Sequence, residues 1–399
     1  MSFNVGINVI EVDGTGAPSI VGAATSVSGF SILTERGGPN TPTPVRGFPE
    51  FVQRFGSYFA GGLGAYLVKG FFDNGGRTAI VNRVVDTDPV SGALSASRTL
   101  ADAAGEDTLR LQAGYRGAAD PGTWGNRLRA RVTASSSASS RVRETARASV
   151  QSTNPLAAQT DMSTFPALSI LIDGETTPTG ISFQPSDFAN AVQATPAEIR
   201  NAINARTGNL VASIAADNRL VLTSTGEVAT LTQGWSGLQV TAANAVLGFT
   251  AMTAPVRGTA AAIAATGTRL ATVSGFQVGD AVRITDGAST AMAKLLSINI
   301  ASGAITWTPA LGTPGGFSGP DTSVRNVEFG ITLALGGNEA ENVVETWSAL
   351  SMEPDLSNYA PAVLNDSIRG SKYVIADDEN SPSAPGLDVP AELGALGVR

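Results

Sequence analysis

One stretch near the start of the chain shows the hydrophobic spacing of a helix followed by that of a strand. Large apolar residues recur on one side of the predicted helix, which covers residues 62–72: Leu63, Tyr66, Leu67 and Phe71. The sequence DNGG at residues 73–76 ends this helix, because a glycine after the last turn easily adopts the left-handed conformation. Residues 78–85 are rich in β-branched side chains and predict a short strand that is buried on both faces.

The flanking segments predict an α/β core around this unit. Short hydrophobic runs predict three further strands, at residues 25–33, 109–113 and 128–132. A helix at residues 49–56 carries Phe51 and Phe55 one turn apart. Prolines bar regular structure from residues 37–47, and the polar, Ala- and Ser-rich residues 86–107 favour a loop.

The first residues of the chain predict an isolated strand. Residues 4–12 alternate, with Val5, Ile7 and Val9 on one side, and Gly- and Pro-containing positions then break the chain. A lone strand cannot satisfy its backbone by itself, so it is expected either to form an edge of the first domain or to add to a sheet of another subunit. The flexible break favours exchange between subunits.

The middle of the chain predicts two inserted units. Residues 168–249 favour a compact α+β domain, with a hairpin at residues 210–223. A capping box beginning at Thr195, with proline at the next position, starts a helix that buries Ile199 and Ile203. Residues 269–311 alternate strongly between glycine-containing turns, which is typical of a small all-β barrel or sandwich of four to five strands.

The last part of the chain predicts a return to the first core. A strand at residues 327–335 is expected beside the strand at residues 128–132, and residues 340–350 show the apolar spacing of a helix. Two shorter elements follow, a helix at residues 359–364 and a strand at residues 372–376. The remaining residues have the composition of a loop.

Composition removes several kinds of chemistry. The 399 residues include no cysteine and no histidine, which excludes disulfides, thiol chemistry, histidine–metal sites and Ser-His or Cys-His nucleophiles. No nucleotide-binding, hydrolase or calcium-loop motif is present. We therefore expect no catalytic, cofactor or metal site, and we expect that the protein is not an enzyme. The net charge of −8 argues against direct nucleic-acid binding. No secretory signal and no run of eighteen apolar residues is visible, so we expect no membrane insertion.

Two further features of the sequence concern charge: the small fraction of charged residues and a cluster of arginines. Charged residues make up only 15% of the chain, which fits either a surface covered by neighbours or an Ala- and Gly-rich genome. Arginines gather between residues 110 and 147, and Arg127, Arg129 and Arg131 form either a solvated basic face or a contact to an acidic segment of another subunit. The acidic residues near the end of the chain supply such a segment: Asp377, Asp378, Glu379, Asp388 and Glu392. Trp124, after an Asp-Pro-Gly turn, is interpreted as a packing anchor.

A family resemblance follows from five pieces of sequence in order. The segment GGLGAYLVKGFFDNGGRTAIVNRV resembles the N-terminal core of tail sheath proteins of contractile phage tails and related contractile injection systems. The pieces NVGINVIEVDG and SILTERGGPNTPTPVRGFPEFVQRFG precede it, and DPGTWGNRLRARV and VVETWSALSMEPD follow it. Together they cover roughly the first third and the last fifth of the chain.

The resemblance implies an α/β (α+β) sheath core domain with an N-terminal strand arm, interrupted by an inserted α+β domain and an inserted small all-β domain. The implied parts are an arm and linker at 1–20, the first part of the core at 21–135, the α+β insertion at 136–258, the all-β insertion at 259–322, and the return to the core at 323–399. Sheath proteins carry further core elements and a C-terminal arm after the strand that residues 372–376 resemble. That part of the pattern is missing from this sequence.

The resemblance also implies a function. Sheath subunits are virion structural proteins that form a homo-oligomeric, helical assembly around an inner tail tube, and contract to drive the tube through a cell envelope during genome ejection. The implied partners are other sheath subunits, the inner tail tube protein, and the baseplate and tail terminator proteins, in a virion tail or in an injection particle assembled in the cytoplasm.

Positions of individual segments follow from the same resemblance. The arm residues Val5, Ile7, Val9 and Glu11 are expected to dock in a neighbouring subunit. The helix at residues 62–72 would lie near the tube, and the insertions at 168–249 and 269–311 would face outward.

A different class of protein is also compatible with the sequence. The small β-rich domains suit a surface-binding or adhesin-like protein that holds a carbohydrate or a receptor. Trp235 and Trp307, if exposed and grouped at one site, would favour this alternative.

Overall fold

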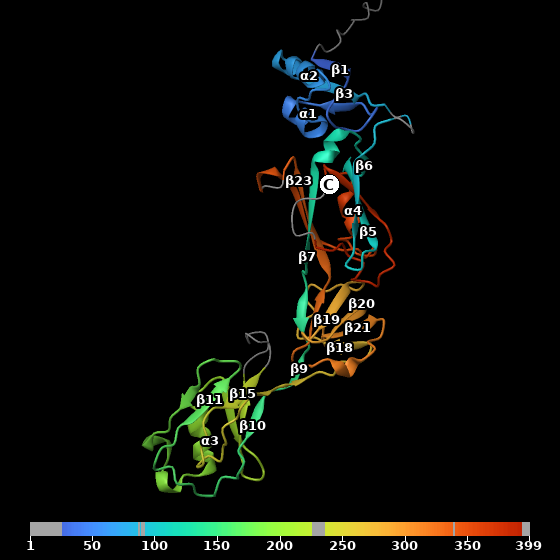
Figure 1. Cartoon of the computed structure of the whole chain (residues 1–399). Helices are drawn as coiled ribbons and strands as arrows, with labels where there is room; N and C mark the ends of the chain where they lie inside the picture. Colours follow the sequence, from blue (N-terminus) through green and yellow to red (C-terminus); the bar gives the residue numbers. More distant parts are fainter. Residues whose placement is uncertain (1–25, 87, 89–91, 226–235, 338–339, 393–399) are drawn as a thin grey trace, which may run out of the picture. The chain divides into compact units, whose positions relative to one another are not determined.

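The computed structural model describes residues 26–86, 88, 92–225, 236–337 and 340–392. It is a mixed α+β protein in which strands predominate (Figure 1). The chain divides into two compact units, which are described separately. Unit 1 contains Met1–Ser97, Gln112–Leu128 and Leu364–Ile375, and unit 2 contains Arg98–Leu111, Arg129–Val363 and Ala376–Arg399.

Unit 1 is built on a small mixed sheet. Its strands are β1 (Val27–Ile32), β2 (Thr43–Val45) and β3 (Thr78–Arg83), in the order β1-β3-β2. β1 runs parallel to β3, with Val27 opposite Thr78, and β2 runs antiparallel to β3, with Pro44 opposite Ile80. The predictions of strands at 25–33 and 78–85 are confirmed. β2 lies in a stretch that was predicted to be irregular. The prediction fails because β2 is an edge strand, where the missing N–H of a proline is tolerated.

Two helices cover one face of this sheet (Figure 1). They are α1 (Phe48–Phe55) and α2 (Gly64–Asp73). The core between the helices and the sheet consists of Val45, Phe51, Phe55, Ala65, Val68, Ala79 and Val81. The prediction that the strand at residues 78–85 is buried on both faces is wrong. Ala79 and Val81 are buried under the helices, whereas Ile80, on the opposite face, is 40% exposed.

A second sheet follows in the chain. It contains β4 (Ser97–Ala101), β5 (Asp107–Tyr115) and β25 (Val374–Asp378), in the order β25-β5-β4, and β6 (Ala118–Ala119) also pairs with β5. The predicted strands at 109–113 and 372–376 are therefore confirmed. β4 corrects the prediction of a loop over residues 86–107. The 3-10 helix η1 (Thr123–Arg127) follows, and its Trp124 is buried, as expected of a packing anchor.

Unit 2 contains a three-stranded sheet of order β24-β23-β7. Its strands are β7 (Leu128–Ser135), β23 (Glu328–Leu335) and β24 (Val343–Leu350), and the short helix α4 (Ala360–Leu364) follows. The predicted pairing of residues 327–335 with residues 128–132 is confirmed. The predicted helix at 340–350 is wrong, since it is β24 after a short 3-10 helix, η5 (Ala340–Asn342). Two register shifts against β23 disturb the alternation of β24, and its apolar spacing therefore imitates a helix.

The small all-β part of unit 2 is a six-stranded sheet. Its strands are β8 (Ser139–Arg141), β18 (Gly267–Arg269), β19 (Ala281–Thr285), β20 (Thr290–Asn299), β21 (Ala304–Thr308) and β22 (Ser323–Asn326). The order is β18-β21-β20-β19-β22-β8. The all-β character was predicted. Four strands, β18 to β21, lie where four to five were expected, and the sheet gains β22 from residues assigned to the returning core and β8 from before the α+β insertion, which is therefore nested between β8 and β18.

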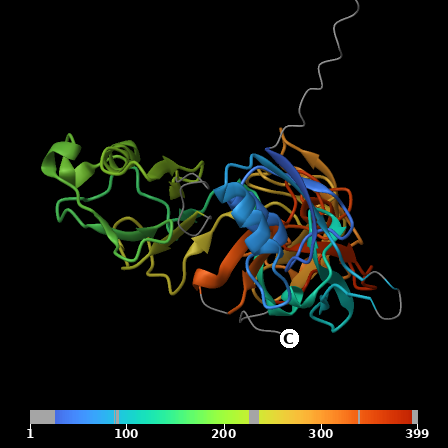
Figure 2. The same cartoon turned by 90° about the horizontal axis from the view of Figure 1, so that it is seen from above.

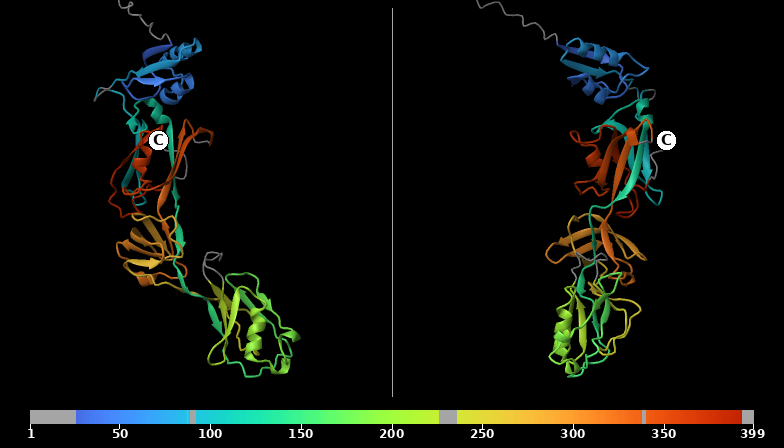
Figure 3. Two further views of the ribbon diagram at one scale, coloured as in Figure 1. Left: turned by 180° about the vertical axis from the view of Figure 1, so that it is seen from behind. Right: turned by 90° about the vertical axis from the view of Figure 1, so that its left-hand side faces the viewer.

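The α+β part of unit 2 carries the helix α3 (Pro196–Asn204) against its strands (Figures 2 and 3). Two sheets have the orders β10-β14-β13 and β12-β11-β15-β16. Their strands are β10 (Ser149–Gln151), β11 (Leu168–Ile172), β12 (Thr179–Ile181), β13 (Leu210–Ile214), β14 (Leu220–Ser224), β15 (Gly237–Val240) and β16 (Val256–Arg257), and β9 (Glu144–Ala146) pairs separately with β17 (Thr259–Ala260). The predicted capping box at Thr195, the hairpin, and the burial of Ile199 and Ile203 are all confirmed.

Candidate functional site

Helix α2 presents large apolar side chains to solvent. Leu63, directly before the helix, is 71% exposed, and Tyr66 and Leu67 are 57% and 56% exposed. The apolar face predicted from the hydrophobic spacing is therefore largely exposed to solvent within the described structure. Among its members only Phe71 turns inward, where its ring meets that of Phe30 at 5.4 Å.

The small residues of α2 explain why its large side chains face solvent. Gly64, Ala65 and Val68 are the buried positions of the helix. A Cβ atom at Gly64 would lie 2.4 Å from the carbonyl oxygen of Leu33, so the helix approaches the end of β1 more closely than a larger side chain would permit. The close approach uses the small face for packing and leaves the large side chains outside. A helix that is apolar on both faces has a second face that needs a partner.

Aromatic rings extend the exposed face of α2. Tyr58, which is 40% exposed, lies in the loop between α1 and α2, and its ring centroid is 4.4 Å from that of Tyr66. The ring of Tyr58 also contacts Phe48, with centroids 5.7 Å apart. We call Tyr58, Leu63, Tyr66 and Leu67 the α2 surface. Its composition, two tyrosines and two leucines without a charge, resembles the centre of a protein interface.

The opposite side of the unit 1 sheet is also exposed in the part of the chain that the structure describes. Val27 on β1 is 46% exposed, and Ile80 on β3 is 40% exposed. Among the described residues β1 pairs only with β3, so its other edge offers unpaired backbone groups. This edge has the geometry that β-augmentation requires. The arm residues Val5, Ile7, Val9 and Glu11, which the sequence suggests as a donated strand, lie outside the described residues.

The three arginines proposed as a basic patch have different surroundings. Arg127 forms an ion pair with Glu35 within unit 1. Arg129 and Arg131 belong to β7 in unit 2 and, two residues apart, lie on the same side of that strand. The Nε of Arg131 is buried and has no hydrogen-bond partner among the described atoms.

The acidic residues near the end of the chain are partly occupied within unit 2. Asp378 accepts a hydrogen bond from the Tyr359 hydroxyl at 2.8 Å, and Glu392 accepts one from the backbone N–H of Ala134 at 2.9 Å. Asp377 and Glu379 are exposed. The acidic surface that remains for a partner is therefore smaller than the sequence suggests.

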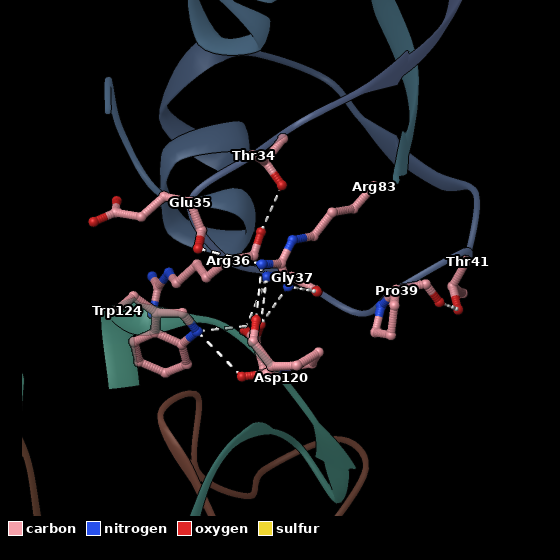
Figure 4. A network of polar contacts seen from close by, with 10 residues as sticks. Thr34, Glu35, Arg36, Gly37, Pro39, Thr41, Arg83, Asp120 and Trp124 are labelled. Atoms are coloured by element: carbon pink, nitrogen blue, oxygen red, sulfur yellow. Dashed lines mark hydrogen bonds and ion pairs between the residues drawn. The ribbon is translucent and has the colours of Figure 1, made fainter. Parts of the chain in front are cut away.

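A buried ion pair between Arg83 and Asp120 connects several backbone segments of unit 1 (Figure 4). Arg83 Nη1 lies 2.9 Å from Asp120 Oδ1, and both side chains are almost completely buried. The N–H of Gly37 donates to both oxygens of the Asp120 carboxylate, at 2.8 and 2.9 Å, and Arg83 donates to the carbonyl oxygens of Gly37 and Pro121. The ion pair therefore ties the loop after β1 to the turn before η1.

Burial and pairing act in opposite directions on this carboxylate. Burial raises the pKa of the Asp120 carboxyl, whereas the N–H of Gly37 and the charge of Arg83 lower it. Burial likewise lowers the pKa of Arg83. The sequence analysis did not single out this pair. The only signal of this pair in the sequence is Arg83, which lies at an inward-facing position of a strand, where an unpaired charge would be costly.

The described residues offer little that is typical of a catalytic site. No group of three or more acidic side chains in this part of the chain is arranged to hold a metal ion. Lys294 Nζ lies 2.6 Å from Glu353, which raises the pKa of the lysine and keeps it charged. Trp307, named for the adhesin-like alternative, is buried, and its indole N–H donates to the carbonyl oxygen of Ala265. Trp235 lies outside the described residues.

Within the same described ranges, no helix combines the length and the hydropathy needed to cross a bilayer.

Comparison with known proteins adds no relative, because neither a protein-family model nor a curated protein matches the chain.

Proposed function

We propose that this protein is a structural subunit of a contractile tail sheath, which polymerises around an inner tube and contracts to drive it through a cell envelope. The observation that carries the proposal is the α2 surface. Four large apolar side chains, from α2 and the loop that precedes it, gather on one exposed surface, while the other side of α2 is already packed. Such a surface is stabilised by burial against another molecule.

The resemblance of the sequence decides which assembly is proposed. The segment that contains α2 is also the segment that most resembles the sheath core, in which the corresponding helix lies near the tube. The α2 surface is then a face on the inner side of the sheath, which neighbouring subunits cover as they stack into rings around the tube.

The open edge of β1 supports the second half of the proposal. A strand donated by a neighbouring subunit adds main-chain hydrogen bonds, which persist while rigid domains rotate about a flexible linker. Subunits linked in this way stay connected during contraction. The driving free energy lies in the difference between two packings of the same subunit, so contraction consumes no nucleotide.

Negative-stain electron microscopy of the purified chain tests the proposal. The chain is compared with the same protein lacking residues 1–16. Tubes or stacked rings that form from the intact chain and not from the shortened one support both the sheath and the donated arm. Tubes from both proteins support the sheath and remove the role of the arm. Monodisperse monomers of the intact chain at high concentration and in several salts contradict the proposal.

A further inference from the structure

We propose that unit 1 contains a binding pocket for a small oxyanion, a carboxylate or a phosphate, held by Arg54 and Arg116. The pocket has a volume of about 230 Å³ and lies entirely within unit 1. Its lining includes both arginines, Tyr115, which both of them approach, and Ser367. This volume suits a phosphate group or the end of an acidic side chain, and it is below the range of pockets for drug-sized ligands.

Both arginines lie over the same aromatic ring. The Cζ atom of Arg54, in the last turn of α1, is 5.2 Å from the centroid of the Tyr115 ring, and that of Arg116 is 5.4 Å from it. Stacking on a tyrosine holds a guanidinium in place while its N–H groups remain available at the edge. Two guanidinium groups held in this way match the oxygens of a carboxylate or a phosphate, which arginine binds through paired hydrogen bonds.

Neither arginine is held by an ion pair within the described residues, although both side chains are partly buried. The Nε of Arg116 is buried and has no hydrogen-bond partner there. Asp366 interacts electrostatically with Arg116, but its carboxylate already accepts hydrogen bonds from the backbone N–H groups of Ile368 and Arg369. A buried donor without an acceptor favours a ligand that supplies one.

The backbone at Arg116 gives an independent reason to expect a role for its side chain. Arg116 and Gly117 are the two residues that connect β5 to β6, since Tyr115 pairs with Ala118. Both have positive φ, +48° and +81°, as a tight hairpin turn of type I′ requires. Asn or Gly is preferred at the first of these positions, and an arginine there is strained. The backbone N–H of Arg116 donates to the carbonyl oxygen of Ser371 at 2.6 Å, which holds the turn in this conformation. Residues kept in strained conformations cluster at functional sites.

Two sources could supply the oxyanion, a free anion from solution or a carboxylate presented by a second copy of the chain. The second source rests on the proposed function, because it requires the copies to associate. The pocket itself does not depend on that association.

Calorimetric titration of the full chain with inorganic phosphate and with succinate, at constant ionic strength, tests the pocket directly, with chloride as the anion that lacks oxygen. We expect saturable binding of at least one oxyanion. Arg54→Gln and Arg116→Asn are each expected to weaken binding by about tenfold or more, because each removes charged hydrogen bonds. Arg116→Asn suits the turn better than arginine, so it should keep the fold at least as stable while it loses the ligand. Arg200→Gln is the matched control and should bind like the wild type, because Arg200 is a partly buried arginine of α3 that donates to the side-chain oxygen of Asn201 and does not line the pocket.

Sedimentation velocity distinguishes the two sources. If a second copy supplies the carboxylate, Arg116→Asn weakens self-association and added phosphate competes with it. If the anion comes from solution, self-association is the same in the variants and in phosphate. The absence of saturable binding in the wild type, together with unchanged self-association of Arg54→Gln and Arg116→Asn, would overturn the proposal. Failure of the wild type to assemble would contradict the sheath function, and the titration would still decide whether the pocket binds an oxyanion.

Discussion

Arg283 and Arg325 lie directly opposite each other on the adjacent antiparallel strands β19 and β22. Both are exposed, and neither forms an ion pair with any carboxylate in the described part of the chain. Like charges at directly opposed positions destabilise a sheet, whereas opposite charges at the same positions stabilise it.

The first prediction follows from this pair. Arg325→Glu replaces a repulsion with an attraction to Arg283, and we expect the free energy of unfolding of unit 2 to rise by roughly 0.5–1 kcal/mol. Urea denaturation at low salt measures the change, and added salt should reduce it. Arg269→Glu is the control, because Arg269 is an exposed strand residue that faces Ala304. An equal gain in the control would show that net charge, and not the cross-strand pair, is responsible.

The buried ion pair of unit 1 gives the second prediction. Asp120→Asn leaves the charge of Arg83 buried without its partner, which is expected to destabilise unit 1 by about 3–5 kcal/mol. Denaturant unfolding followed by tryptophan fluorescence detects the loss, since Trp124 donates its indole N–H to the backbone carbonyl of Asp120. Arg127→Gln removes the exposed ion pair with Glu35 and should cost less than about 1 kcal/mol. Similar losses for both variants would contradict a central role of the buried pair.

The third prediction concerns the pH dependence of stability. Asp280 should make unit 2 less stable as the pH rises, whereas acid denaturation makes a protein less stable as the pH falls. Burial raises the pKa of Asp280 to about 6, helped by the nearby charges of Glu328 and Glu353. Between about pH 4 and pH 6 the folded state therefore keeps a proton that the unfolded state has lost. The contribution of Asp280 thus makes unit 2 less stable as the pH rises through this window, by on the order of 1–3 kcal/mol.

Asp280→Asn, which resembles the protonated form, tests this sign. Urea unfolding from pH 4 to pH 8 should show the variant gaining stability over the wild type as the pH rises. Asp286→Asn is the control. Backbone N–H groups, first that of Ser289, donate hydrogen bonds to Asp286 and lower its pKa from 3.8, so its contribution to stability is lost only below the tested range, and this variant should differ from the wild type by a nearly constant amount from pH 4 to pH 8. A constant difference between Asp280→Asn and the wild type at every pH would contradict the assignment.

Local signals along the chain predicted those parts of the fold that local chemistry determines. The helix α3 begins where Thr195 and Pro196 place it, because the capping box and the fixed φ of proline act within four residues. The hairpin of β13 and β14 is local in the same sense. β24 was misread because its pairing with β23 contains two register shifts, which are set by a partner strand and are invisible in its own sequence.

The candidate site was harder to predict, for a physical reason. Periodicity identified an apolar face of α2 but could not tell which of its two faces packs inside. The decision depends on the contact between Gly64 and the backbone at Leu33, which only the tertiary structure reveals. The positions of Arg54 and Arg116 likewise depend on Tyr115, which is far from Arg54 in the sequence.

Two glycines of α2 give the fourth prediction. A Cβ atom at Gly70 meets nothing within 4 Å, so Gly70→Ala should stabilise unit 1 by up to about 1 kcal/mol through helix propensity. Gly64→Ala places its methyl group against the carbonyl oxygen of Leu33 and is expected to destabilise the unit by about 1–3 kcal/mol. Thermal unfolding of the two variants should therefore shift in opposite directions. A gain for both would mean that α2 does not pack closely against β1.

Neighbouring residues on opposite faces of α2 give the fifth prediction. Leu67 is 56% exposed, so Leu67→Glu should change the free energy of unfolding by no more than about 0.5 kcal/mol. Val68 is completely buried, and Val68→Ala should lower the free energy of unfolding by about 1–3 kcal/mol. Assembly reverses the order of the two effects. A carboxylate on the α2 surface would be buried without a partner in an interface, so Leu67→Glu should abolish tubes or rings in electron micrographs. Val68→Ala should still form them below its unfolding temperature, because it leaves the α2 surface unchanged. Normal assembly of Leu67→Glu would show that the α2 surface is not the interface through which this protein polymerises.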